Sequence, residues 1–151
     1  MHHRLSLSAA LVFTLLALAT GCASQFPKSN DNLEPASAEF DVPPKELIEK
    51  IRAALSTGSD AIGITEQAKG TLLTGFERHP GEWHVGRRWQ EQTRYRITII
   101  PDFEQPTARS RVEVREQTQQ RAAEGMKWEP LESDRQDRAQ ALLDRIRQQL
   151  Q

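Results

Sequence analysis

The feature that most constrains this chain is an apolar run near its beginning that ends at the only cysteine. Residues 5–19 consist almost entirely of Leu, Ala, Val and Phe, after a short basic start. The run is shorter than the ~20 residues that a membrane-spanning helix needs, and its length is typical of a cleaved targeting signal. Small residues directly precede Cys22, where a peptidase needs narrow side chains. The sequence therefore predicts that residues 1–21 are a signal peptide and do not belong to the fold.

Residues 15–22, LLALATGC, resemble the lipobox of bacterial lipoproteins. In that family the cysteine thiol is diacylated and the preceding peptide is cut away. The family pattern prefers Leu, Val or Ile three residues before the cysteine, whereas here Ala19 stands there and Leu18 lies one place earlier. Ala23 follows the cysteine, in place of the aspartate that retains many such lipoproteins at the inner membrane. The resemblance implies lipidation at Cys22 and attachment to the periplasmic face of the outer membrane.

Two other interpretations of the apolar run are weaker. An ordinary secretory signal would leave Cys22 as a lone thiol in an oxidising compartment. A buried amphipathic helix is disfavoured because the polar residues of the run do not recur on one face. Lipidation resolves the first difficulty, since each buried CH₂ contributes about 0.8 kcal/mol and several acyl chains make anchoring stable.

The chain that remains after cleavage has room for one domain. Removing 21 of 151 residues leaves 130, and the net charge moves from −1 to −2 because the leader holds one arginine and no acid. This near balance gives no long-range field to attract nucleic acid. Residues 22–40 are rich in Ser, Asn, Asp, Pro and Ala, which indicates a lipidated cysteine followed by a flexible tether. Residues 41–151 are expected to form a single periplasmic domain.

Hydrophobic periodicity within that domain predicts an α+β fold. Leu47, Ile51 and Leu55 recur at helical spacing after Pro43-Pro44, and an apolar stripe follows a capping signal at Ser133. Between the two helices we expect three or four antiparallel strands, formed by Ala61–Ile64, Thr71–Arg78, Trp89–Ile99 and residues 111–115. Residues 79–88 and 117–125 are expected in loops or a hairpin extension. Both helices, including a long C-terminal one, should cover the same apolar sheet face.

This order of elements resembles the helix-grip arrangement of the BamC-like lipoproteins, accessory subunits of the outer-membrane β-barrel assembly machinery. The resemblance covers residues 40–151 in order of elements, the lipobox, and a weak pattern at Gly70-Thr71 and Arg94-Tyr95-Arg96. Members of that family carry two such domains after a long tether, and this chain has room for one. The resemblance implies a lipid-anchored accessory module that binds an envelope protein, and it carries over no partner-binding residue.

The segment before the third strand concentrates unusual side chains. His79, Glu82 and His84 are types that zinc accepts, but neither H-E-x-x-H nor a Cys-x-x-Cys pair is present. An exposed hairpin loop with incidental histidines is therefore the preferred interpretation, and no metal or other cofactor is predicted. Trp83 either folds back on the edge of the core, the favoured alternative, or is offered to a membrane interface or a partner.

Arginines recur at outward positions of the predicted strands. A cationic patch for lipid headgroups or an acidic partner would contain Arg87, Arg88, Arg94, Arg96, Arg109, Arg111 and Arg115. The favoured alternative is a solvated face on which Glu91, Glu113 and Glu116 form cross-strand ion pairs with these arginines. The residues predicted to bind a partner, if the patch exists, are Trp83, Arg87, Arg88, Arg94 and Arg96.

Enzyme signatures are missing from the sequence. There is no G-x-S-x-G, no Gly-rich phosphate loop after a strand, and no thiol once Cys22 is lipidated. The first hypothesis is thus a non-enzymatic outer-membrane lipoprotein that binds another envelope protein, with β-barrel assembly as the implied process. The alternative is a carrier or sensor that holds an apolar ligand between the sheet and the C-terminal helix. Bulky predicted core residues such as Trp89, Tyr95 and Leu142 favour the first.

Overall fold

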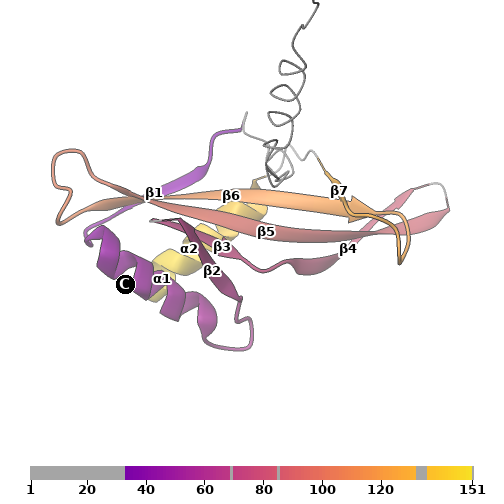
Figure 1. The fold of residues 1–151 in the computed structure, drawn as a ribbon, viewed down its shortest axis with the longest axis horizontal. Coiled ribbons are helices and arrows are strands. Elements are labelled where there is room, and N and C mark those ends of the chain that lie inside the picture. The colour runs from indigo at the N-terminus through magenta and orange to yellow at the C-terminus, as the bar shows by residue number, and fades with distance from the viewer. Residues whose placement is uncertain (1–32, 69, 85, 132–135, 151) are drawn as a thin grey trace, which may run out of the picture.

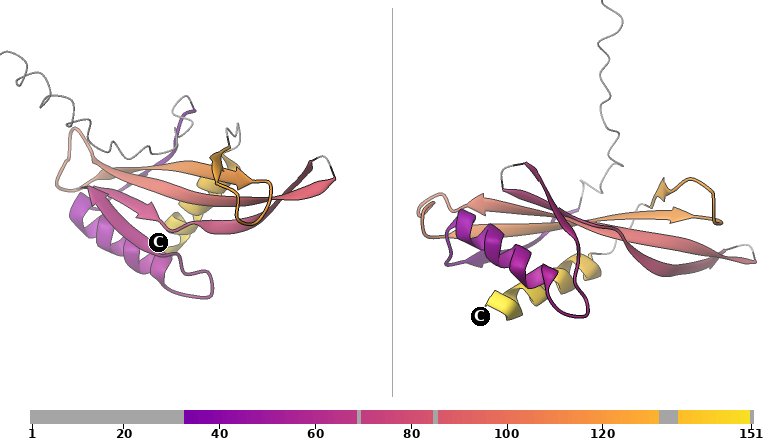
Figure 2. Two further views of the ribbon diagram at one scale, coloured as in Figure 1. Left: turned by 45° about the vertical axis from the view of Figure 1, so that its right-hand side comes forward. Right: turned by 60° about the horizontal axis from the view of Figure 1, so that its bottom comes forward.

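The computed structural model describes residues 33–68, 70–84, 86–131 and 136–150. Within them the elements are β1 (Ala36–Phe40), α1 (Pro44–Ser56), β2 (Ile64–Ala68), β3 (Thr71–Thr74), β4 (Glu77–His84), β5 (Arg87–Pro101), β6 (Ser110–Arg121), β7 (Glu129–Pro130) and α2 (Asp137–Leu150). The strands form one antiparallel sheet, and both helices cover the same face of it (Figure 1 and Figure 2). The predicted α+β class, with an antiparallel sheet and a helix towards each end, is confirmed.

The sheet has more strands than predicted, seven in place of three or four. Its order is β1-β6-β5-β3-β2, while β4 continues along β5 beyond β3 and β7 pairs with β6. The long β5 and β6 pair, flanked by β4 and β7, extends past both helices on the right of Figure 1. We call this extension the arm; it contains β4, β7, residues 87–94 of β5 and residues 117–121 of β6.

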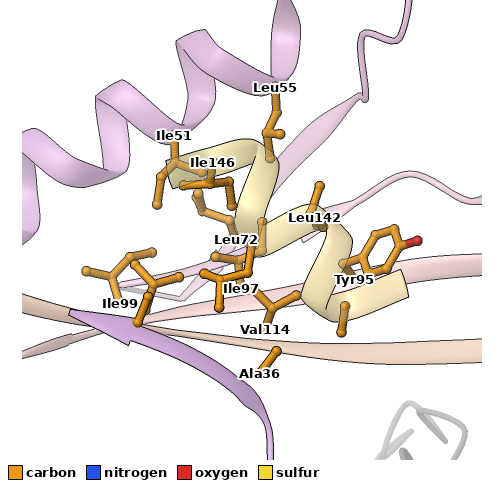
Figure 3. Close-up of a cluster of buried hydrophobic side chains, with 14 of the residues drawn as sticks. Ala36, Ile51, Leu55, Leu72, Tyr95, Ile97, Ile99, Val114, Leu142 and Ile146 are labelled. Atoms are coloured by element: carbon orange, nitrogen blue, oxygen red, sulfur yellow. The ribbon is translucent and has the colours of Figure 1, made fainter. Parts of the chain in front are cut away.

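The core lies between the helices and the sheet. Leucine and isoleucine side chains of both helices meet the inward side chains of the central strands (Figure 3). The largest fully buried aliphatic residues are Leu47, Ile51, Leu55, Leu72, Ile97, Val112, Val114, Leu143 and Ile146. The spacing that predicted α1, and the alternation that predicted the central strands, are confirmed by this burial.

The last part of the predicted tether is wrong, because residues 36–40 form β1. This strand pairs with β6, and Ala36 and Ala38 are buried in the core. Its inward residues are small because α2 packs against this edge of the sheet. Two alanines separated by a serine carry almost no strand signal in the sequence, so the strand could not be distinguished from the polar segment before it.

The predicted strand over Thr71–Arg78 is in fact two strands separated by a bulge. Leu73 pairs with Arg96 and Glu77 pairs with Thr93, so three residues of this strand oppose two of β5. The Thr74 hydroxyl fills the gap by accepting a hydrogen bond from the Tyr95 backbone N–H, at 2.8 Å. The extra residue exchanges the faces of the strand, because even-numbered residues point inward before the bulge and odd-numbered ones after it.

The segments expected in loops beyond this bulge are largely strand. His79 and Pro80 belong to β4, where proline is tolerated because it lies on an edge strand. A second shift of register follows at Gly81, where an added Cβ would lie 2.5 Å from the carbonyl oxygen of Trp89. Residues 117–121 likewise continue β6. Because these segments are polar, they lack the alternation of apolar residues from which a strand is predicted.

Two other boundaries also differ from the prediction. Ile62 is buried in the loop before β2, and its N–H donates to the Leu55 carbonyl, at 2.7 Å, so the strand begins at Ile64. Ser133, the predicted cap of the C-terminal helix, lies outside the described residues. Within the described part α2 spans 14 residues and α1 spans 13, so the expected difference in length is small.

Candidate functional site

The strands β5 and β6 divide their side chains between two faces, both within the arm and next to it. Tyr95 and Ile97 of β5 point towards the helices and are buried, so the alternate residues lie on the opposite face (Figure 3). On that opposite face the register pairs Gln90 with Arg121, Gln92 with Gln119, Arg94 with Gln117, and Arg96 with Arg115; β4 adds Arg78 beside Gln92 and Trp83 beside Arg88. We call the surface formed by Arg78, Arg88, Arg94, Arg96, Arg115 and Arg121 the arginine face.

Neutral side chains hold several of these arginines in place. The Arg94 Nε donates to the side-chain Oε1 of Gln117 at 2.8 Å, and the Arg121 Nε donates to the side-chain Oε1 of Gln90 at 2.6 Å. Between them Gln92 donates to Gln119 at 2.7 Å. These cross-strand hydrogen bonds order the guanidinium groups and leave their positive charge without compensation.

Aromatic rings support the same two arginines. The Arg94 guanidinium lies 4.8 Å from the ring centroid of Phe76, and the Arg121 guanidinium lies 4.5 Å from that of Trp128. Cation–π contacts of this kind position a guanidinium without neutralising it. Glutamine and aromatic neighbours therefore fix the direction of the charges on this face.

Arg96 and Arg115 form the unusual pair of the arginine face. They lie directly opposite each other on adjacent strands, an arrangement of like charges that destabilises a sheet. Arg115 donates one hydrogen bond, from Nη1 to the Leu33 carbonyl oxygen at 2.9 Å. No carboxylate within the described ranges pairs with Arg96. Burial, and next the charge of Arg96, lower the pKa of Arg94.

The predicted ion pairs form at only one end of the sheet. Arg111 pairs with Glu113 at 3.1 Å, although within β6 and not across strands as expected, and Arg109 pairs with Asp41 at 2.6 Å. The other two predicted carboxylates, Glu91 and Glu116, lie on the helix-facing side. For Arg94, Arg96 and Arg115 the solvated ion-pair face is therefore wrong, because the strand period places these acids on the opposite face.

The tip of the arm carries the remaining predicted partner-binding residues. Trp83 is 67% exposed, which rules out the favoured expectation that it folds back on the core edge. Arg87 and Arg88 are also exposed. By register Trp83 and Arg88 share the arginine face, whereas Arg87, opposite His84, belongs to the other face. The structure thus places four of the five predicted residues on one face, Trp83 and Arg88 at the tip and Arg94 and Arg96 further along β5.

The helix-facing side of β5 and β6 holds a polar cluster that was not predicted from the sequence. Arg138 in the first turn of α2 reaches Glu91 at 3.3 Å, Glu116 at 3.6 Å and the Thr93 hydroxyl at 3.0 Å. The Thr118 hydroxyl donates to the same carboxylate oxygen, Glu116 Oε1, at 2.7 Å. The sequence did contain evidence for this cluster. Glu91 and Glu116 are each separated by an even number of residues from the apolar residues of their strands, so they point to the same face.

This cluster surrounds the only tyrosine. Tyr95 is 5% exposed, and its hydroxyl points away from the aliphatic side chains of the core (Figure 3). Burial, followed by the negative charges of Glu77 and Glu116, raises the pKa of Tyr95 to about 12. Glu116 Oε2 and His79 Nε2 are buried without a hydrogen-bond partner. With its carboxylates paired to Arg138, the cluster joins α2 to the arm.

Metal and ligand sites were the other predicted possibilities. The described residues contain no group of three or more His, Cys, Asp or Glu side chains that could hold a metal ion. The side chains of Glu82 and His84 fall outside the described part of the structure. Between the sheet and α2, aliphatic side chains from both layers fill the interior (Figure 3). An open groove of about 520 Å³ lies instead between the helix ends, lined by Lys50, Ala53, Ala54, Thr57, Gln149 and Leu150.

Comparison with known proteins leaves the site to be interpreted from its own geometry. No protein-family model and no curated protein sequence matches the chain. Among the helices of the described ranges, none combines the length and apolar character needed to cross a membrane. Cys22, the predicted lipidation site, lies outside the described residues.

Proposed function

We propose that this chain is a lipid-anchored periplasmic accessory module at the outer membrane, which binds another envelope protein through the tip of its arm and catalyses no reaction. The process that the BamC-like resemblance implies is β-barrel protein assembly. The helix-grip arrangement belongs to this proposal, with α2 packed across the curved sheet. In this role the domain is a rigid body that the lipid on Cys22 keeps close to its partner.

The exposed tip of the arm is the observation that carries the proposal. Trp83 is 67% exposed and is paired with the exposed Arg88, and both lie at the end of a strand pair that extends past the helices. Tryptophan and arginine are enriched in protein interfaces and in their energetic hot spots. A rigid two-stranded support holds these side chains away from the body of the domain, where a partner can surround them.

Site-specific photocrosslinking in intact cells tests this proposal. A photoreactive residue replaces Trp83 in one variant and Phe103 in a second; Phe103 is 99% exposed in the loop at the opposite end of β5 and β6. We expect a discrete adduct with an envelope protein from the Trp83 variant and none from the Phe103 variant. Adducts of equal yield from both positions, or from neither, would contradict binding through the tip.

The anchor is tested separately by metabolic labelling with a radioactive fatty acid. The native chain is expected to incorporate the label and to fractionate with the outer membrane, because Cys22 is the only cysteine and therefore the only thiol that can be acylated. Cys22→Ser should abolish incorporation. Recovery of unlabelled native protein in the soluble periplasmic fraction would disprove the anchor.

A further inference from the structure

The arginine face lies on the side of the sheet from which the chain enters the fold. Both helices cover one face, and β1 arrives from the side opposite to them (Figure 1). The Leu33 carbonyl accepts the hydrogen bond from Arg115, at 2.9 Å, so the described chain begins beside this face. Ten residues lie between Cys22 and Leu33. At full extension they span about 40 Å, so an anchor at Cys22 keeps this face within a short distance of the membrane.

Within the arginine face all the charged side chains are of one sign; the nearest acid on this side of the sheet, Glu113, lies in the next row and pairs with Arg111. Five rows of paired residues make up the face: Trp83–Arg88, Pro80–Gln90–Arg121, Arg78–Gln92–Gln119–Pro130, Arg94–Gln117 and Leu73–Arg96–Arg115. None of these positions is Asp or Glu, although the chain as a whole has more acids than bases. Such segregation of charge attracts an anionic surface over short range.

The pair Arg96 and Arg115 indicates which chemical group the arginine face would bind. Arg96 and Arg115 are paired across adjacent strands, so both side chains leave the sheet on the same face, and Arg94 lies two residues from Arg96 on that face. A phosphate group placed between two arginines accepts charge-assisted hydrogen bonds from both and removes their repulsion. The surrounding glutamines and rings already hold the neighbouring guanidinium groups in place.

We propose that the arginine face binds the phosphate groups of anionic phospholipids in the membrane that holds the lipid on Cys22. This inference rests on the proposed anchor and deepens it, because a lipid chain combined with a basic surface is the two-signal arrangement that gives stable membrane attachment. A domain held in this way lies with its sheet on the leaflet and its helices facing the periplasm. The tip of the arm then points along the membrane, towards proteins embedded in it.

Fluorescence quenching in vesicles tests this orientation. The lipidated protein is reconstituted in phosphatidylcholine vesicles with or without phosphatidylglycerol, both containing a quencher attached to a lipid headgroup. Ser37→Cys carries a dye on the arginine-face side of β1, where Ser37 pairs with Glu113, and Ser56→Cys carries it at the end of α1. Both serines are exposed, and acylation of Cys22 leaves the introduced thiol as the one that is labelled.

The inference predicts stronger quenching at position 37 in vesicles that contain phosphatidylglycerol, with little change at position 56. The double variant Arg96→Gln/Arg115→Gln should reduce the docked population about fivefold for each arginine removed. Its matched control is Arg145→Gln/Arg147→Gln, which makes the same change of charge on α2 and should leave quenching at position 37 unaltered.

The possible results separate the two proposals. Protein that does not float with the vesicles has no anchor, which overturns the proposed function and this inference together. Protein that floats but shows equal quenching with both lipids is anchored without headgroup binding, which overturns this inference alone. If Arg96 variants lose the crosslinked partner of Trp83 while quenching is unchanged, the face binds an acidic protein, and the lipid assignment is wrong.

Discussion

The two faces of the β5–β6 pair share the same strands and differ in how their charges are compensated. The helix-facing side gathers Glu91 and Glu116 around Arg138, a cation supplied by α2. The other side presents Arg94, Arg96 and Arg115 with no acid in the same rows. One face is neutralised within the fold and stabilises it, whereas the other keeps a charge that only an external group can neutralise. The period of two along a strand therefore separates a structural site from a binding surface.

The two faces also differ in whether their charges contribute to the free energy of folding or to that of binding. Glu116 has a side chain that is 8% exposed, so its carboxylate depends on Arg138 and Thr118 for compensation. Arg96 is partly exposed, and its repulsion from Arg115 remains in the free protein. Substitutions on the helix-facing side should therefore affect folding, and substitutions on the arginine face should affect binding.

Removal of the cation from the helix-facing cluster should give the largest effect. Arg138→Met leaves two partly buried carboxylates without a positive partner, and we expect the free energy of unfolding to fall by about 2 kcal/mol, less than for a fully buried pair because Arg138 is 39% exposed. Denaturant titration measures the loss. Arg147→Met, which breaks an exposed pair with Asp144 on the same helix, is the control and should cost less than about 0.5 kcal/mol. Equal losses would mean that the cluster does not hold α2.

The pKa of Tyr95 predicts a loss of stability at high pH. Because the pKa is raised to about 12 in the folded state, the folded protein keeps the phenolic proton longer than the unfolded chain does. This contribution is fully present below pH 10 and is lost as the pH rises from 10 to 12, by about 2 kcal/mol. As the chain has one tyrosine, absorbance of tyrosinate reports the titration directly. Tyr95→Phe should remove the effect, and a midpoint near pH 10 would contradict it.

The bulge at Gly81 should determine the register of β4, and with it the face of the sheet on which Trp83 lies. An alanine there places its Cβ 2.5 Å from the Trp89 carbonyl oxygen, so Gly81→Ala should displace β4 and lower the free energy of unfolding by about 1–2 kcal/mol. Gly63→Ala has free space around the new Cβ and serves as the control. Hydrogen exchange of the β4 amides should increase in the first variant only. Unchanged exchange would show that Gly81 does not set the register.

The smallest effect, and the one of opposite sign, is expected on the arginine face. Arg96→Gln removes the repulsion from Arg115 and should raise the free energy of unfolding by about 0.5 kcal/mol while it weakens binding to anionic vesicles. Arg111→Gln, which loses its pair with Glu113, should not stabilise the protein. Thermal unfolding compares the two variants. A destabilised Arg96→Gln would mean that the face is already neutralised within the fold.

Much of the fold was predictable from particular residues. Leu47, Ile51 and Leu55 indicated α1, and Ile97 and Ile99 indicated β5, because their periods place large side chains on one buried face. β1 could not be predicted because Ala36 and Ala38 are too small to give a hydrophobic pattern. Residues 79–84 of β4 and 117–121 of β6 could not be predicted either, because their polar side chains give no hydrophobic pattern; those of β6 form Gln–Gln and Arg–Gln hydrogen bonds with β5.

The sequence predicted which residues belong to the candidate site, but it did not predict which of them share a surface. The sequence alone identified the arginines and Trp83 as candidates, and it determined the lipobox-like segment that ends at Cys22. The tertiary structure decided which face each charge occupies, because two bulges shift the parity of β4 and the pairing of β5 with β6 sets the neighbours. It also brought Arg138 from the far end of the chain to Glu91 and Glu116. Charge type is a property of each residue, whereas compensation of charge depends on contacts between residues distant in sequence, and only folding creates them.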